Sequence, residues 1–273
     1  MQTVTLTPAQ QSRDTTASLF SYFALTFLLA WSLWLVAATL GARPLYFLPG
    51  TFAPGLVALL FAAHRGGSAA VRHLLSGLFR WRVSAKWYVF AIAYLTIAKL
   101  LAAVVHRVME GSWPAFGQTP FIVLLGGVLI STPFQAGEEV GWRAYALPRL
   151  GRRMGMPWAS VVLGVIWACW HIPLFYIAGT DSFGQPFTVY LVSVTAVSVV
   201  LAWLYVRTGG SLLLVMVMHS AFNNTGSVVP ARTANAADPL ALSAAPIAWY
   251  TAALLAIAAA FFLTRLRHAK LAS

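Results

Sequence analysis

Long apolar runs separated by short polar segments form the main pattern of the chain. Most of these runs approach the roughly 20 residues that a helix needs to cross a bilayer. A segment in lipid must satisfy its own backbone hydrogen bonds, so we expect helices, and the alternating pattern of a membrane β-barrel is missing. We predict about eight transmembrane helices, at about Ser18–Leu40, Leu45–Ala63, Trp87–Val105, Pro120–Ala136 continuing to Leu147, Pro157–Ala178, Phe187–Val206, Ser211–Val229 and Ala245–Leu263.

The positions of Lys and Arg residues predict the orientation of these helices. With a cytoplasmic N-terminus, 14 of the 18 cations fall inside, Lys99 lies within a run, and only Arg43, Arg107 and Arg232 fall outside. The positive-inside rule favours this orientation, and an even number of spans makes the C-terminus cytoplasmic too. The first run is too long for the core of a signal peptide, so we expect it to be retained as a span.

A segment between the second and third runs has its own helical pattern. Its apolar residues are spaced i, i+3, i+4, i+7 and i+8, with arginines nearby, which is typical of an amphipathic helix in the membrane interface. A simple connector is the alternative interpretation. The apolar positions are Val71, Leu74, Leu75, Leu78 and Phe79.

Composition narrows the class of protein further. Hydrophobic residues make up 60% and charged residues 9% of the 273 positions, which excludes a water-soluble globular protein. The net charge is +12, and the basic residues behind it lie between the apolar runs. We therefore expect these residues to contact lipid headgroups, and we expect no nucleic-acid partner. We therefore predict an all-α, polytopic membrane helix bundle. Residues 1–273 would form one integral membrane domain, with a catalytic core at about residues 120–229.

Two adjacent acids, Glu138 and Glu139, lie within the fourth apolar run. A carboxylate in a bilayer is costly unless it is paired or neutralised, so such a pair marks a functional site. On a helix, Glu139 and Arg143 share a face at i,i+4 spacing and are expected to form an ion pair. Glu138 projects about 100° away, which leaves it available as a general base. A purely structural cluster of the three charges is the alternative.

Later runs carry three more costly polar residues: His171 in the fifth, and His219 and Asn223 in the seventh. A rise of about 1.5 Å per residue puts Glu138, His171 and His219 roughly 13–15, 21 and 12 Å from the cytoplasmic helix ends, which is compatible with one layer. The carboxylate and one histidine could activate water, while the other histidine and Asn223 could donate to an oxyanion. A lone histidine that only packs and hydrogen-bonds is the alternative for each ring.

The order of these motifs resembles a known family. Glu-Glu-x-x-x-Arg, aromatic-x-x-x-His and His-x-x-x-Asn on successive membrane helices are similar to the CPBP intramembrane proteases, the type II CAAX prenyl endopeptidases and their bacterial relatives. The resemblance runs from about Gly127 to Thr225. It implies that Glu138 activates water with help from His171, that His219 and Asn223 stabilise the oxyanion, and that Glu139 and Arg143 support the site. Trp167 stands where the family usually has Phe, which could change the width of the pocket.

The cofactor and the biological role stay open at this stage. By residue type Glu138, His171 and His219 could bind Zn²⁺, whereas a metal-free glutamate mechanism also suits a single free carboxylate. We expect a peptide or protein substrate in or at the bilayer of a bacterial-type plasma membrane, and a site that faces the cytoplasm. A proton-coupled transporter and a non-catalytic scaffold or immunity protein are the competing interpretations.

Overall fold

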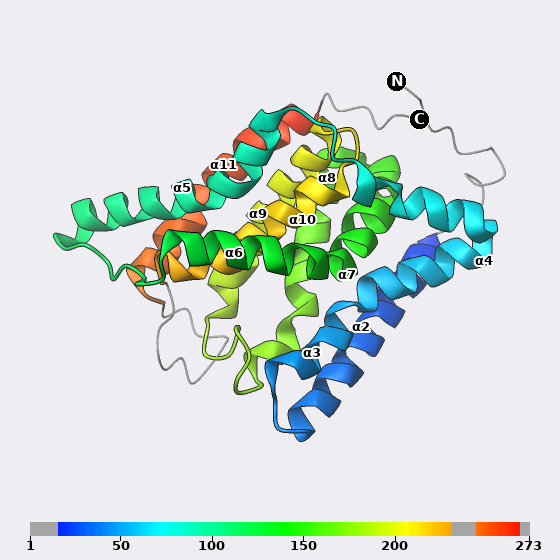
Figure 1. The fold of residues 1–273 in the computed structure, drawn as a ribbon, viewed down its shortest axis with the longest axis horizontal. Coiled ribbons are helices and arrows are strands. Elements are labelled where there is room, and N and C mark those ends of the chain that lie inside the picture. The colour runs from blue at the N-terminus through cyan, green and yellow to red at the C-terminus, as the bar shows by residue number, and fades with distance from the viewer. Residues whose placement is uncertain (1–15, 231–243, 268–273) are drawn as a thin grey trace.

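The protein is a bundle of helices, as the sequence predicts. The computed structural model describes residues 16–230 and 244–267, and every regular element within these ranges is helical (Figure 1). The main helices are α2 (Thr16–Thr39), α3 (Pro44–Thr51), α4 (Ala53–Leu75), α5 (Ala85–Glu110), α6 (Phe121–Ser131), α7 (Ala136–Glu139), α8 (Leu147–Trp170), α9 (Phe187–Arg207), α10 (Leu212–Asn224) and α11 (Pro246–Leu266). Short helical segments join or extend them, among them η5 (Thr225–Ser227) after α10.

Six helical stretches in the described ranges are long and apolar enough to cross a membrane. The difference from the predicted eight has two causes. The fourth and fifth predicted spans join into one stretch, Phe121–Trp170, and α10 has 13 residues, about 20 Å at the rise of an α-helix, which is short of a hydrocarbon core of about 30 Å. The cytoplasmic position of both termini stays a prediction, because residues 1–15 and 268–273 lie outside the described ranges. Six candidate spans in the described ranges leave the count of eight unconfirmed.

The acidic motif lies where the helical geometry changes. After α6, a 3₁₀ turn η2 (Thr132–Gln135) leads into the single turn α7, and a π-helix η3 (Val140–Ala146) follows. Pro133 in η2 lacks a backbone N–H, which favours this break in the α-helix. Single π-helical turns are rare and often occur at functional sites, because the wider turn redirects side chains.

Close packing against α4 fixes the position of the acidic motif. A Cβ on Gly55 of α4 would lie 2.7 Å from the carbonyl oxygen of Gly137, and one on Gly141 would overlap Pro54. Glycine at these positions therefore lets the two backbones touch, as at other helix contacts in membranes. A large buried core that includes Trp34, Trp142 and Trp170 surrounds this contact.

Helix α8 ends earlier than the apolar pattern predicts. The fifth run was expected to extend to Ala178, but α8 ends at Trp170, and η4 (Ile172–Phe175) follows. Pro173 explains the early end, because proline cannot donate to a preceding turn and disfavours helical geometry in the residue before it. His171 consequently lies at the end of a helix and not in its middle.

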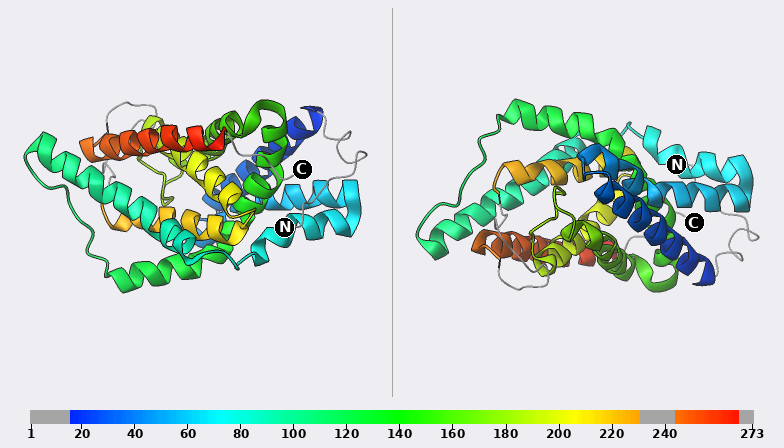
Figure 2. Two further views of the ribbon diagram at one scale, coloured as in Figure 1. Left: turned by 90° about the horizontal axis from the view of Figure 1, so that it is seen from above. Right: turned by 90° about the horizontal axis from the view of Figure 1, so that it is seen from below.

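The segment predicted as an amphipathic helix or connector is helical and packs on the bundle. Helix α4 is interrupted at Gly66 and Gly67, and a second helical piece runs on through η1 (Ser76–Phe79). Ser211, which caps the start of α10 by accepting from Leu214 N, donates to the carbonyl of Arg80 just after η1. Figures 1 and 2 show α2, α3 and α4 on one side of the molecule, and the far end of α5 on the opposite side.

Candidate active site

Glu139 is the centre of a buried ionic cluster. Its Oε1 accepts from Arg143 Nη1 at 2.9 Å, and His219 Nδ1 lies 2.6 Å from the same oxygen. Glu139 and Arg143 are fully buried, and His219 is 2% exposed. The predicted i,i+4 ion pair is therefore confirmed. The structure adds that His219, from a helix 80 residues away, binds this glutamate and not Glu138.

Glu138 is less free than expected. Its Oε2 accepts from the indole Nε1 of Trp167 at 2.6 Å and from that of Trp142 at 3.3 Å. Indole N–H groups only donate, so Glu138 Oε2 is the acceptor in both contacts. Glu138 is 6% exposed, and the two bonds leave its Oε1 for another partner. The sequence interpretation of an unengaged carboxylate is thus corrected to one held by two indoles.

His171 has a hydrogen bond that determines its tautomer. Its Nδ1 lies 2.9 Å from the carbonyl oxygen of Trp167. Because a carbonyl oxygen only accepts, Nδ1 carries the hydrogen, and Nε2 of the neutral ring is left with a lone pair. The ring is half-buried, and it interacts electrostatically with Glu138. Glu138 and His171 are both neighbours of Trp167, which bonds Glu138 through its indole and lies 6.1 Å, ring to ring, from His171.

One side chain, Trp167, contacts the functional groups from all three motifs. Besides the hydrogen bond to Glu138, its ring lies 4.6 Å from Arg143 Cζ, 5.0 Å from the His219 ring and 6.1 Å from the His171 ring. The structure thus gathers Glu138, the arginine and the two histidines around one indole, while Glu139 binds the arginine and His219. A phenylalanine at this position could not donate to Glu138, so Trp167 contributes more than the width of a pocket.

Asn223 lies at the edge of this group. It is exposed, and its Nδ2 is 3.5 Å from Oε1 of Gln135, a residue of η2. Among the contacts of the described residues, none joins Asn223 to His219 or to either glutamate. Asn223 shares a face of α10 with His219 through the i,i+4 spacing, which directs both side chains to the same side.

The zinc set considered from the sequence is corrected. Among the described residues, no three His, Cys, Asp or Glu side chains form a group that could hold a metal ion. Nδ1 of His219 bonds Glu139 and Oε2 of Glu138 accepts from two indoles, so neither of these atoms is left for a metal ion. The donor set in this geometry does not fit zinc.

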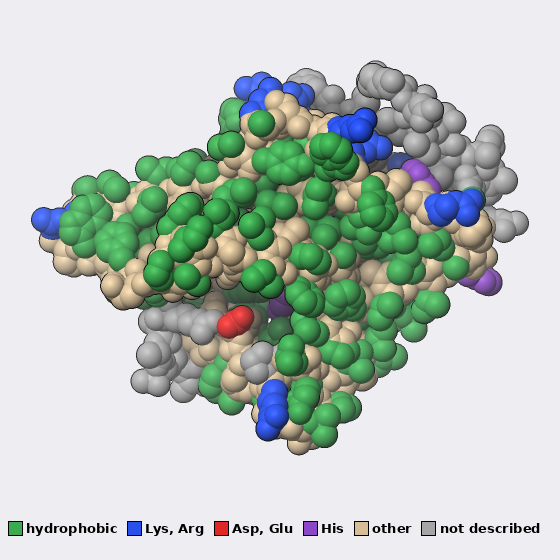
Figure 3. Space-filling model, in the orientation of Figure 1, with side chains coloured by type: hydrophobic (Ala, Val, Ile, Leu, Met, Phe, Trp, Pro, Cys, Tyr) green, Lys and Arg blue, Asp and Glu red, His purple; other side chains and the backbone are tan. Residues whose placement is uncertain are grey.

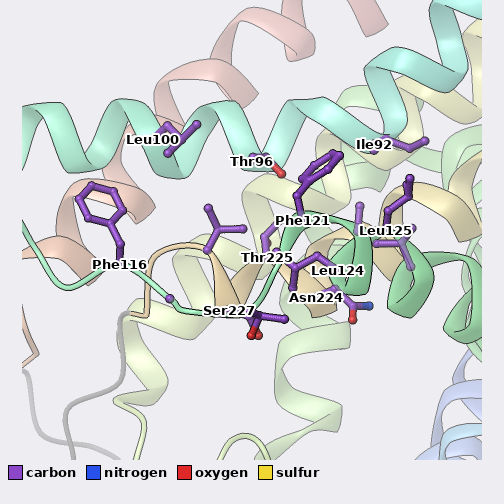
Figure 4. A pocket seen from close by; sticks show the side chains of 15 residues that line it. Ile92, Thr96, Leu100, Phe116, Phe121, Leu124, Leu125, Asn224, Thr225 and Ser227 are labelled. Carbon is purple, nitrogen blue, oxygen red and sulfur yellow. The ribbon is translucent and has the colours of Figure 1, made fainter.

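An apolar cavity of about 440 Å³ lies between α5, α6 and the end of α10. Figure 4 shows Phe121, Leu124 and Leu125 of α6 opposite α5 at this cavity. Its wall on α10 contains Ala221 and Asn224 and none of the residues described above. At 100° per residue, Ala221 points about 200° away from both His219 and Asn223, so the cavity lies behind the candidate catalytic face.

Sequence reasoning missed several residues around the site. Trp142 stands four positions after Glu138, as Arg143 does after Glu139, so the same spacing rule could have found it. Gln135 precedes the acidic pair and contacts Asn223. Trp34 and Tyr190 place their rings 6.2 and 5.5 Å from His171, but they come from distant segments whose proximity no local pattern signals.

Comparison with known proteins agrees with the motifs. Residues 117–225 match the family described as type II CAAX prenyl endopeptidase Rce1-like. A relative from Methanococcus maripaludis, named CAAX prenyl protease 2, is 24% identical over 223 residues, which cover 74% of this chain and 81% of that protein. The matched family segment contains every candidate site residue.

The helical membrane fold and these similarities support a membrane-embedded protease. The chain is an integral, multi-pass membrane protein. Residues 117–225 are similar to the type II CAAX prenyl endopeptidases, which agrees with the resemblance found in the sequence.

Proposed function

We propose that the chain is an intramembrane endopeptidase that hydrolyses peptide bonds of membrane-associated proteins. In this proposal Glu138 and His171 activate water, and His219 and Asn223 stabilise the oxyanion. The observation that carries the proposal is the arrangement of Glu138, His171, His219 and Arg143 around one indole, that of Trp167, inside an apolar bundle. A constellation held this tightly is a preorganised site, which reduces the reorganisation needed during reaction.

Water activation follows from the two groups that accept hydrogen bonds. Oε1 of Glu138 and Nε2 of His171 can both accept from one water molecule. As the water oxygen attacks the carbonyl carbon, one of these groups takes a proton, and the carbonyl oxygen becomes an oxyanion. Return of that proton to the departing nitrogen breaks the C–N bond and releases an amine and a carboxylic acid, which then transfers its proton to the amine or to solvent.

The oxyanion needs hydrogen-bond donors. Asn223 supplies an exposed amide nitrogen, and His219 can donate from Nε2 when its ring is in the imidazolium form, because Nδ1 already bonds Glu139. Glu139 orients the His219 ring in this scheme. Buried Arg143 keeps Nε and Nη2 without a hydrogen-bond partner among the described residues, which suits a role in orienting substrate.

We infer the substrate class from the position of the site within the membrane helices. A site among apolar helices is accessible to peptides that are attached to, or inserted in, a membrane. The relative is named a CAAX prenyl protease, so we include prenylated C-terminal peptides among the substrates to be tested. We further propose that the protein lies in a bacterial-type plasma membrane and that its site opens to the cytoplasmic side.

Reconstitution into liposomes tests the proposed function directly. We expect purified protein to cleave members of a membrane-anchored peptide library, with fragments identified by mass spectrometry. Proton or solute flux without fragments would favour a transporter that uses the buried glutamate and histidines as a relay. Absence of both flux and fragments would favour a scaffold, and either outcome would overturn the peptidase proposal.

Trp167→Phe tests the hydrogen bond between Trp167 and Glu138. The variant keeps an aromatic ring for packing but loses a donor to a charged group, a loss of about 1.5–3 kcal/mol. We expect kcat to fall by about tenfold to a hundredfold, with KM changed much less, because the bond positions the base and does not bind substrate. Steady-state cleavage kinetics in liposomes measure both constants.

Trp158→Phe is the matched control for this variant. Trp158 lies on the same helix α8 and is 67% exposed. Its substitution should leave both constants near the wild-type values. An unchanged kcat in Trp167→Phe, or an equal decrease in the Trp158 control, would contradict the positioning role.

A further inference from the structure

Three helices meet in an aromatic cluster at the end of the bundle where α5 begins and α9 and α11 end. The Trp203 ring of α9 lies 5.5 Å from Trp87 and 5.3 Å from Phe90, both on α5. It also lies 4.6 Å from Phe262 of α11. These four rings form a continuous packed group, which we call the Trp203 cluster. The cluster holds the three helix ends together.

Basic side chains from two of these helices converge on one ring of the cluster. Lys86 Nζ lies 5.1 Å from the centre of the Trp87 ring, and Arg207 Cζ lies 5.9 Å from the same ring. Lys86 belongs to the first turn of α5 and Arg207 to the last turn of α9, and both side chains are exposed. Two basic residues 121 positions apart in the chain are thus both placed at the Trp87 ring.

The last turn of α11 adds a third cation nearby. Arg265 lies 4.9 Å from the Phe261 ring, which is 5.4 Å from the Phe262 ring of the cluster. Figure 3 shows Lys and Arg side chains gathered along the upper edge of the molecule, above a largely apolar face. Arg265 borders exposed apolar surface, because Phe261 beside it is 53% exposed.

No described carboxylate neutralises these charges. Among the described residues, Lys86, Arg207 and Arg265 make contacts with aromatic rings and no ion pair with an acid. Glu110 lies at the far end of α5, and Asp181 precedes α9 at the end away from Arg207. An anion from outside the described chain is the complementary partner.

The position of the site decides the kind of anion. The cations lie at the ends of helices that are long and apolar enough to cross a bilayer, which is the depth of lipid phosphates. Tryptophan beside Lys and Arg is the usual composition of this interface, and basic clusters between membrane helices bind anionic headgroups. Val89, 65% exposed on the next turn of α5, offers apolar surface for an acyl chain.

We propose that Lys86, Trp87 and Arg207 form a binding site for the headgroup phosphate of an anionic phospholipid. The two cations bind the phosphate from α5 and α9, and the exposed apolar surface of α5 receives the start of the acyl chain. This site is separate from the residues assigned to hydrolysis. The inference therefore stands or falls independently of the proposed peptidase activity.

Lipid selectivity of the full-length protein tests the proposal. The protein is reconstituted in phosphatidylcholine vesicles, and the association of spin-labelled phosphatidylglycerol is compared with that of spin-labelled phosphatidylcholine. We expect a clear preference for the anionic lipid in the wild type. The double variant Lys86→Gln with Arg207→Gln should lose that preference by about tenfold or more, since each basic residue contributes on the order of 1 kcal/mol.

Matched variants separate this site from general charge. Arg43→Gln with Arg107→Gln also removes two exposed cations and should keep the preference. Arg43 directly precedes α3, and Arg107 lies in the last turn of α5, at the other end of that helix from Lys86. Arg207→Lys preserves the charge and should keep it too, and the single variants Lys86→Gln and Arg207→Gln should each lose part of it. A loss in the Arg43 and Arg107 control equal to that in the double variant would overturn the site.

Inorganic phosphate distinguishes a lipid from a free anion. Added at ionic strength matched with chloride, phosphate should leave the lipid preference unchanged. Displacement of the labelled lipid by millimolar phosphate would show a site for the free ion and overturn the lipid proposal. Equal association of the two lipids with the wild type would overturn it as well.

Discussion

Glu138→Gln is expected to abolish peptide cleavage while the protein still folds and inserts into membranes. The substitution removes the negative charge and the basic oxygen but keeps the shape of the side chain. A glutamine carbonyl can still accept from the indoles of Trp167 and Trp142, so the packing around position 138 is retained. A general base contributes about 10²–10⁴ to the rate, and the loss of its charge next to the attacking water adds to that.

Glu110→Gln provides the matched control for the Glu138 variant. Glu110 is a described carboxylate outside the site, and its Oε1 accepts from Tyr250 at 2.6 Å. The same chemical change there should leave cleavage unaffected. Both variants are compared with wild type by fragment yield in liposomes and by elution as a monodisperse species. Unchanged cleavage by Glu138→Gln would remove the general-base assignment.

His171→Ala should lower kcat by about 10²–10⁴, the usual contribution of a positioned acid–base group. The hydrogen bond from Nδ1 to the Trp167 carbonyl leaves Nε2 as the basic atom, and alanine removes it. His171 lies at the end of α8, so the change interrupts no helix. Single-turnover cleavage kinetics measure the chemical step and separate it from substrate binding.

Chemical rescue and a second histidine make this test specific. Imidazole added to His171→Ala should restore part of the rate, because a small base can enter the space that the ring leaves. His106→Ala is the control, since His106 also directs Nδ1 to a backbone carbonyl, that of Ser112, at 2.9 Å. A full rate in His171→Ala, or equal losses at both positions, would contradict a role in proton transfer.

Local spacing explains which parts of the site could be predicted. Glu139 and Arg143 pair because they are four residues apart on one helical segment, and no other part of the fold is needed for that contact. The same rule applied to Glu138 would have revealed Trp142. The end of α8 at Trp170 also has a local cause, Pro173, although the longer apolar run concealed it.

Contacts between distant segments could not be predicted in the same way. Both histidines were expected near a carboxylate, but the choice of Glu139 for His219 depends on how α10 is rotated against η3. The indole of Trp167 bonds Glu138, a residue 29 positions earlier in the chain. From the sequence, Trp in place of the usual Phe predicted only a change in pocket width, because the hydrogen-bond partner of its N–H was not known.

The sequence by itself determined the helical membrane class, because apolar runs of spanning length leave the backbone no other partner than itself. It also determined which residue types carry the chemistry, since acids and histidines in lipid are too costly to be incidental. The tertiary structure decided how these groups pair. Hydrogen bonds act over about 3 Å, so the partners of Glu138, Glu139 and His219 depended on helix packing that no local pattern encodes.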